Sequence, residues 1–173
     1  SGTRVIAVWE QRWSGQPDGP VCAYLHGVGD PSNVGAVIRS AQALVEGTVV
    51  IGPGCADPYS PKAVRASMGS IFAQPIARGS VAETPEPRMA LVAHGGDRLG
   101  ERPGPPLTVC LGAEREGLPT EVLDRCASSV TIPLRAGAES LNVAAAAAIV
   151  LQWISSPASE ARAAPSPEGE RNG

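Results

Sequence analysis

Residues 130–153 constrain the fold more than any other stretch, because strand, loop and helix signals follow one another there within one short segment. Residues 130–132 form a short β-branched run, and Pro133 ends it because proline lacks the amide hydrogen that a strand ladder needs. A polar, glycine-containing loop follows, and a helix is expected from about Leu141 to Ile154. A loop anchored between a strand and a helix is well placed to hold a ligand.

The expected helix has no polar side chain between Val143 and Leu151, so the pattern predicts that it is buried on every face. Ser140 or Asn142 is expected to cap its first amide groups. The apolar run is about 12 residues long, whereas a membrane-spanning helix needs about 20. The sequence therefore predicts a core helix of a folded domain.

Short apolar runs alternate with helical patterns along the chain, which favours a parallel sheet with helices on both faces. The length of 173 residues suits one domain, and the 3% of aromatic residues implies an aliphatic core. We expect strands at 21–25, 48–51, 89–93, 107–111 and 130–132, and an edge strand at 4–8. We expect helices from Pro31, over 60–66 and from Pro119 to about Cys126, with surface connections at 80–88 and 98–106.

Charge and cysteine content limit the partners that the sequence favours. The net charge is −3, so RNA binding would have to use local patches rather than the field of the whole molecule. The positive residues are almost all arginines, a bias that fits phosphate contact but equally a biased genome composition. Four cysteines without paired spacing favour neither a metal site nor a disulfide framework, and indicate a reducing, cytoplasmic compartment.

The common phosphate-binding and hydrolase motifs are missing from the sequence, which contains no G-x-G-x-x-G, no G-x-x-x-x-G-K-[ST] and no G-x-S-x-G. In parallel sheets, ligands bind outside the carboxyl ends of strands. Here those ends carry loops at 94–96, 112–114 and 133–140. We expect these three loops to form the site.

The sequence also contains three separated motifs, and two of them include residues of those loops. Residues 33–39 read N-V-G-A-V-I-R, residues 111–118 read L-G-A-E-R-E-G-L, and residues 132–143 contain I-P-L followed by E-S-L-N-V. With these motifs the chain resembles the SpoU (TrmH) family of RNA 2′-O-ribose methyltransferases, in the SPOUT superfamily, over about residues 21–154. The resemblance implies a parallel-sheet α/β/α fold with a C-terminal deep trefoil knot, in which the last strand and helix thread through an earlier loop.

The resemblance also implies the cofactor, S-adenosyl-L-methionine. Carried over by position, its contacts are Ala93, His94, Gly112, Ile132 and Leu141. An adenine ring needs an apolar slot, and a glycine allows close approach of a ligand to the chain. No metal is implied.

The catalytic set that the resemblance implies is Asn33, Arg39, Glu114, Ser140 and Asn142. Because a guanidinium scarcely loses its proton, we expect Arg39 to stabilise a developing alkoxide or an RNA phosphate. Arg39 follows Gly35 by one turn, and the glycine is expected to leave space beside it.

Simpler roles remain open for this set. Asn33, Ser140 and Asn142 are also suitable helix caps. Glu114 has an adjacent Arg115 with which to pair, and Arg39 has Glu46 within reach on the same helix.

The expected organisation is a methyltransferase domain at 21–156, preceded by an extension or linker remnant at 1–20 and followed by a disordered tail at 157–173. The resemblance implies an RNA substrate, tRNA or rRNA, and a homodimer with the site at its interface. Five arginines expected in loops would supply phosphate contacts if they share a face: Arg65, Arg98, Arg102, Arg115 and Arg135. The alternative is a catalytically silent module that binds RNA or S-adenosylmethionine.

Overall fold

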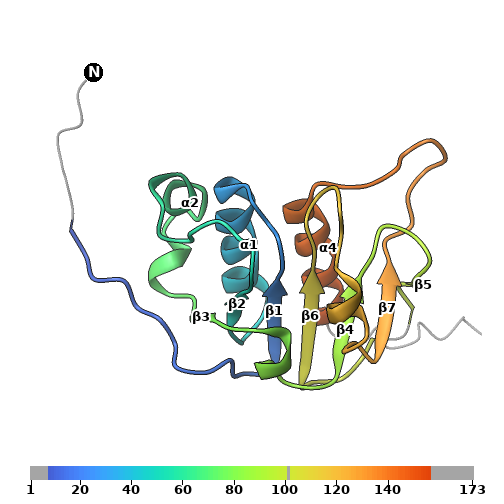
Figure 1. Ribbon diagram of the computed structural model, residues 1–173, viewed down its shortest axis with the longest axis horizontal. Coiled ribbons are helices and arrows are strands. Elements are labelled where there is room, and N and C mark those ends of the chain that lie inside the picture. The colour runs from blue at the N-terminus through green and yellow to red at the C-terminus, as the bar shows by residue number, and fades with distance from the viewer. Residues whose placement is uncertain (1–7, 101, 157–173) are drawn as a thin grey trace, which may run out of the picture.

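The computed structural model describes residues 8–100 and 102–156, which form a seven-stranded sheet of order β3-β2-β1-β6-β4-β7-β5 (Figure 1). All strand pairs within these residues are parallel. The strands are β1 (Val21–Leu25), β2 (Val49–Ile51), β3 (Ile76–Arg78), β4 (Arg88–Leu91), β5 (Asp97–Arg98), β6 (Leu107–Leu111) and β7 (Ser128–Thr131). The helices are α1 (Pro31–Leu44), α2 (Pro61–Ala66), α3 (Thr120–Leu123) and α4 (Val143–Ser155), with 3-10 turns η1 (Ser70–Phe72) and η2 (Val81–Glu83).

The two central strands, β1 and β6, are buried at every position and pair in register from Val21 with Leu107 to Leu25 with Leu111. Strands buried on both faces read as continuous apolar runs, which is why the sequence predicts these two so well. Alternate side chains serve two cores. Leu25 and Leu111 pack under α1 and α4, whereas Tyr24 faces η2 and α3.

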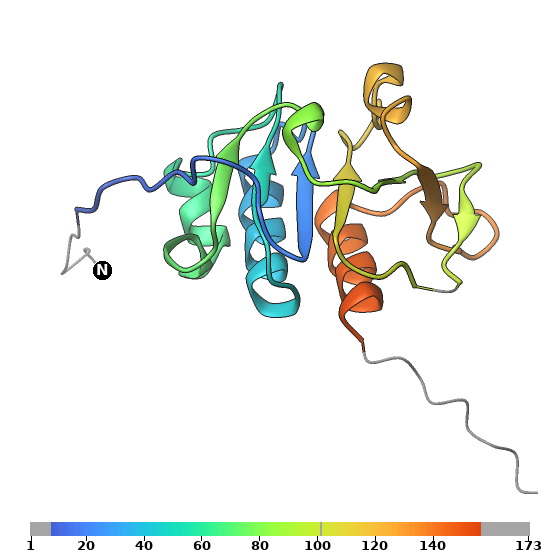
Figure 2. The ribbon, with the colours of Figure 1, turned by 90° about the horizontal axis from the view of Figure 1, so that it is seen from below.

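The longer helices lie on one face of the sheet. Figure 2 shows α1, α2 and α4 together on that face, with η2 and α3 on the other. The parallel α/β architecture is therefore confirmed, although the second helical layer consists of short turns only.

Helix α4 is not buried on every face, so that prediction is wrong. Val143, Ala147 and Val150 are buried, but Ala145 is exposed and Ile149 is 42% exposed. Because α4 lies on the sheet and beside α1, only its near side is covered. No helix within 8–100 or 102–156 is long and apolar enough to cross a bilayer.

Helix α2 packs tightly on α1 at Gly35. A Cβ there would lie 2.3 Å from the Ala63 carbonyl oxygen and 2.8 Å from the Ala66 Cβ. The glycine therefore admits α2, and the prediction that it leaves space beside Arg39 is wrong.

The segment 80–88 is not merely a surface connection. Arg88 is only 6% exposed, and it begins β4. Its guanidinium donates to Glu86 Oε1 at 2.8 Å and to Thr84 Oγ1 at 3.0 Å, which satisfies the buried charge. The predicted sequence of elements also lacked the short strands β3 and β5, and it extended α3 beyond Leu123.

Several expectations fall on other parts of the chain. The predicted edge strand at 4–8 lies outside the described residues except for Val8, which is irregular, and the tail at 157–173 lies outside them entirely.

Helix α4 contacts the connection between β5 and β6, where Trp153 Nε1 donates to the Gly100 carbonyl at 3.3 Å. Strand order does not itself define threading, so the trefoil knot stays a prediction.

Candidate active site

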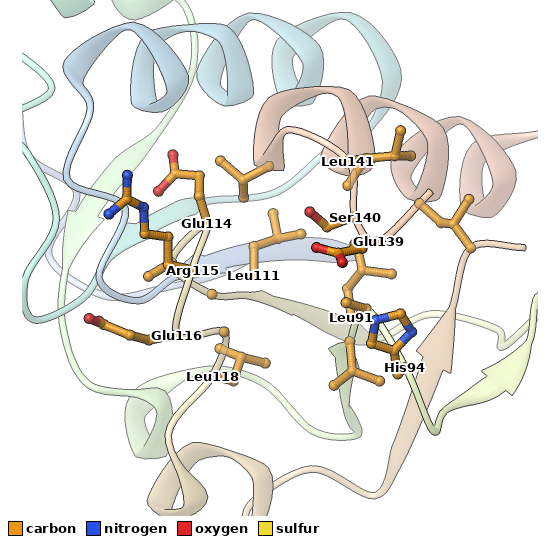
Figure 3. Close-up of a pocket in the computed structure, with 18 of the residues that line it drawn as sticks. Leu91, His94, Leu111, Glu114, Arg115, Glu116, Leu118, Glu139, Ser140 and Leu141 are labelled. Carbon is orange, nitrogen blue, oxygen red and sulfur yellow. The ribbon is translucent and has the colours of Figure 1, made fainter. Parts of the chain in front are cut away.

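A cavity of about 700 Å³ lies at the carboxyl ends of β4, β6 and β7. Figure 3 shows the charged side chains of residues 114–116 on one side of it and His94, Glu139 and Ser140 on the other, with Leu111 between them. This is the strand edge at which the sequence predicts the site. The three expected loops all contribute, and the lining residues are Leu91, Val92, Ala93, His94, Leu111, Gly112, Ala113, Glu114, Arg115, Glu116, Gly117, Leu118, Ile132, Leu134, Glu139, Ser140, Leu141, Val143 and Ala146.

The start of α1 is fixed by Asp30, which places Asn33 in the first helical turn. Asp30 accepts from the Ser32 amide at 2.7 Å and from Lys62 Nζ at 2.9 Å. The hydrogen bond from Lys62, followed by that from the Ser32 amide, lowers the pKa of the Asp30 carboxyl. Asp30, not Asn33, is therefore the cap of this helix.

Glu114 is held at the tip of a tight antiparallel turn. The amides and carbonyls of Ala113 and Gly117 bond reciprocally, at 3.1 and 3.0 Å. Gly117 has a φ of +70°, a left-handed conformation that favours glycine. A Cβ on Gly112 would lie 2.3 Å from the Gly117 carbonyl carbon, so Gly112 is required by the turn itself as well as lining the cavity.

A chain of side-chain hydrogen bonds joins the three motifs across sequence separations of 81 and 109 residues. Asn142 Nδ2 donates to Asn33 Oδ1 at 3.0 Å, and Asn33 Nδ2 donates to Glu114 Oε1. Asn142 Oδ1 accepts from the Ala144 amide at 2.9 Å and so caps α4.

The helix cap determines which groups donate and which accept in this chain of hydrogen bonds. Because the first amides of α4 require an acceptor, Asn142 must turn its oxygen toward them and its nitrogen toward Asn33. Asn33 must then accept from Asn142 and donate to Glu114. One carboxylate is thereby fixed beside the cavity by two amide side chains.

The five residues predicted to contact a cofactor all line the cavity: Ala93, His94, Gly112, Ile132 and Leu141. Ser140 lines it as well and is not the cap of α4. Sequence reasoning missed several apolar lining residues, among them Leu91, Leu134 and Ala146. Their only signal is adjacency to the predicted residues along the same strands, loop and helix.

Arg39 forms no hydrogen bond to the other predicted catalytic residues within the described part of the chain. It follows Asn33 by six positions, which is about 9 Å along the helix axis, and, like Asn33 and Asn142, it is not among the lining residues. Its side chain is exposed, and within the described residues it has neither a hydrogen bond nor an ion pair. The alternative pairing with Glu46 is therefore not observed. Glu114 likewise bonds Asn33 and not Arg115.

Two of the five arginines considered for RNA phosphates lie far apart, so the five do not all share one patch. Arg65 lies in α2, at the opposite end of the sheet from Arg98 in β5 (Figure 1). Within residues 8–100 and 102–156, no three side chains are grouped as metal ligands, and all four cysteines are free thiols.

The sequence profile of the SpoU rRNA Methylase family matches residues 20–152, which includes every residue of the hydrogen-bonded chain. The chain belongs to this family. SpoU relatives with similar sequences include an uncharacterized tRNA/rRNA methyltransferase of Mycobacterium tuberculosis, 35% identical over 140 residues, covering 73% of this chain and 49% of the relative. Another is the 23S rRNA (uridine(2479)-2′-O)-methyltransferase of Streptomyces viridochromogenes, 36% identical over 135 residues, covering 70% of this chain and 47% of the relative. The chain thus spans about half the length of these two SpoU proteins.

Solved SpoU structures have the same fold. An AdoMet-bound rRNA methyltransferase from Sinorhizobium meliloti superimposes with a TM-score of 0.74 at 31% identity, over 84% of this chain and 61% of the other. AviRb from Streptomyces viridochromogenes, a SpoU methyltransferase in complex with AdoMet, gives a TM-score of 0.70 at 30% identity, over 77% of this chain and 56% of the other.

Proposed function

We propose that this SpoU domain transfers the methyl group of S-adenosylmethionine to a ribose 2′-hydroxyl in rRNA or tRNA. The observation that carries the proposal is the hydrogen-bonded chain of Asn142, Asn33 and Glu114 at the edge of the cavity. Relatives named as 2′-O-methyltransferases and tRNA/rRNA methyltransferases support the reaction and the substrate class. Residues 21–156 are the proposed catalytic domain.

The cavity suits S-adenosylmethionine in size and lining. Its volume of about 700 Å³ falls within the usual range for small-molecule sites. Leu91, Leu111 and Ile132 offer an apolar slot for an adenine ring, and Ala93, His94 and Leu141 are proposed to complete it with Gly112. When bound, S-adenosylmethionine supplies a methyl group already activated on a sulfonium.

The residues of this chain would align and polarise the attacking hydroxyl. Glu114 Oε1 is occupied by Asn33, and the other carboxylate oxygen has no partner within the described residues, so it is able to accept from a ribose hydroxyl. Ser140 places its own hydroxyl on the opposite side of the cavity from Glu114 (Figure 3). Holding the hydroxyl in one orientation removes much of the entropic barrier to the transfer.

Arg39 is proposed to act across a subunit interface. It is exposed and, unlike Asn33 and Asn142, it has no hydrogen-bond or ion-pair partner within the described residues of its own subunit, which leaves its guanidinium free to reach the site of a second copy. The uncovered apolar side of α4, with Ala145 and Ile149, is the surface proposed for this homodimer. There Arg39 would stabilise the developing alkoxide or bind an RNA phosphate.

Mixed dimers test the shared site. Arg39→Ala should lower transfer about a hundredfold and leave S-adenosylmethionine affinity unchanged, as expected for a positioned catalytic group. If sites are shared, mixing this variant with Asn142→Asp, which is itself expected to lose about tenfold or more in transfer, should restore about a quarter of wild-type activity, since half of the dimers then have one intact site. No recovery after confirmed subunit exchange would place Arg39 in its own subunit's site or outside the mechanism.

The product distinguishes ribose methylation from base methylation. Unmodified rRNA and tRNA would be incubated with tritiated S-adenosylmethionine and then hydrolysed with alkali. Alkali cleaves RNA through the free 2′-hydroxyl, so label in alkali-resistant dinucleotides is expected. Label released as mononucleotides would refute the proposed position. No label on either RNA would favour the silent module.

A further inference from the structure

Four of the six aromatic residues of the chain gather at one end of the sheet, beside the edge strand β3. We call this surface the aromatic edge, and it consists of Trp9, Trp13, Tyr59 and Phe72. The Trp9 and Phe72 rings meet edge-to-face with centroids 5.3 Å apart, and the Trp13 and Tyr59 rings do so at 5.1 Å. Trp13 and Tyr59 are half-buried against the main core, whereas Trp9 and Phe72 are exposed.

The segment that carries both tryptophans is fixed to the domain. The Ser14 amide donates to the Ile76 carbonyl at 2.7 Å, and the Tyr59 hydroxyl donates to the Arg12 carbonyl. Figure 2 shows this segment crossing β3 before the chain enters β1. Together with Tyr59 and residues 71–76, this segment lines a second, open cavity of about 610 Å³, which is large enough for a nucleotide.

The aromatic edge exposes aromatic side chains together with guanidinium groups. Trp9 is 42% exposed and Phe72 is 60% exposed. Arg78 Cζ lies 4.4 Å from the centre of the Trp13 ring, and Arg12 lines the cavity. Within the described residues neither arginine forms an ion pair, and Glu10 is the only carboxylate among the lining side chains.

This combination matches single-stranded RNA better than a protein partner. Unpaired bases stack on exposed aromatic rings and on guanidinium planes, and arginines also contact phosphates. A net charge of −3 provides little general attraction, so stacking has to supply a large share of the affinity. A double helix would not fit this surface as well, because its bases are already stacked on one another.

We propose that the aromatic edge binds an unpaired stretch of the substrate RNA by stacking bases on Trp9 and Phe72. The inference rests on the proposed function for the identity of this RNA as the substrate. The surface lies at the β3 end of the sheet, whereas the active-site cavity lies at β4, β6 and β7, so the bound stretch is distinct from the nucleotide that is methylated. The preferred substrate class is therefore RNA that has an unpaired stretch apart from the target ribose.

The direct test measures RNA affinity without methyl transfer. A fluorescein-labelled oligoadenylate of about 12 nucleotides, a typical single-strand site size, is titrated with wild-type protein and with the Trp9→Ala/Phe72→Ala double variant. The dissociation constant should rise about tenfold or more in the variant, because stacking of bases on both rings is lost. Leu123→Ala, which removes an exposed apolar side chain from α3, is the matched control and should bind like wild type.

Two further readouts separate stacking from loss of structure. Trp9→Phe retains a ring and should recover most of the affinity. In a Trp13→Phe/Trp153→Phe protein, where Trp9 is the remaining tryptophan, oligoadenylate should quench the emission, and a self-complementary RNA duplex should quench it much less. S-adenosylmethionine binding by calorimetry should be the same in wild type and in the double variant.

An unchanged dissociation constant in the double variant would overturn the inference, as would an unquenched Trp9. A change in oligomeric mass with unchanged RNA affinity would assign the aromatic edge to a protein contact, and would also overturn it. If oligoadenylate binds through Trp9 but no RNA is methylated, the proposed function fails and the aromatic edge remains an RNA-binding surface.

Discussion

At the scale of single residues, Asn142 performs two tasks that one substitution separates. It caps α4 through Oδ1 and donates to Asn33 through Nδ2. Aspartate caps helices as well as asparagine does, but it has no N–H to donate. Asn142→Asp should therefore keep the melting temperature near that of wild type while methyl transfer falls about tenfold or more, the equivalent of one good hydrogen bond. Thermal denaturation and single-turnover transfer measure the two effects.

Asn142→Ala is the companion variant, because alanine supplies neither the acceptor nor the donor. It should lose activity similarly and also about 1 kcal/mol of stability from the missing cap. If Asn142→Asp is as active as wild type, the hydrogen bond to Asn33 has no part in catalysis and the residue is only a cap.

The sequence predicted these residues as a set but not how they contact one another. Nothing in local pattern links Asn33 to Glu114 or Asn142, which are distant in the chain, and only the family resemblance brought them together. Their direct bonds arise from the parallel order of β1, β6 and the strand before α4. That Arg39 does not line the cavity likewise depends on how the chain folds around Asn33, which no local pattern contains.

At the scale of elements, the contact between α1 and α2 depends on Gly35. A Cβ at this position would overlap the Ala63 carbonyl, so Gly35→Ala should force the helices apart and lower the free energy of unfolding by roughly 1–3 kcal/mol. Gly15→Ala is the matched control, because a Cβ on Gly15 meets no atom within 4 Å. Urea denaturation of both variants measures the difference, and equal midpoints would contradict the close-packed contact.

Elements with strong periodicity or continuous apolar runs were predicted well, as β1, β6 and α1 illustrate. The strands β3 and β5 have only three and two residues, too few to show a pattern, and they are strands because β2 and β7 pair with them. Helix α4 was predicted to be buried because alanine and isoleucine count as apolar. Whether a neighbour covers that face depends on the assembly, which a single-chain pattern does not contain.

At the scale of the whole molecule, alkaline stability should depend on Tyr24. Its hydroxyl is within 3.0 Å of His26 Nδ1, and burial raises the pKa of Tyr24 to about 12. A tyrosine in the unfolded chain ionises near pH 10. Between about pH 10 and 12 the Tyr24 hydroxyl is therefore ionised in the unfolded chain but still protonated in the folded protein. The stability from burying the neutral hydroxyl is fully present below pH 10, and the free energy of unfolding falls as the pH rises through this range.

The size of this effect on the free energy of unfolding is roughly 3 kcal/mol across that range. Tyr24→Phe lacks the ionisation, so its stability should decline less steeply than that of wild type, although at pH 8 it should be about 1 kcal/mol less stable through the lost hydrogen bond. Urea denaturation from pH 8 to 11 measures both curves. Parallel curves would contradict the buried, un-ionised state of Tyr24.

The central claim is that three loops at the carboxyl edge of the sheet form one site for S-adenosylmethionine beside the chain of Asn142, Asn33 and Glu114. A crystal structure of this protein grown with saturating S-adenosylmethionine tests it most directly. The account predicts cofactor density in the cavity lined by His94, Gly112 and Leu141. Density for the cofactor elsewhere, with this cavity open, would contradict it.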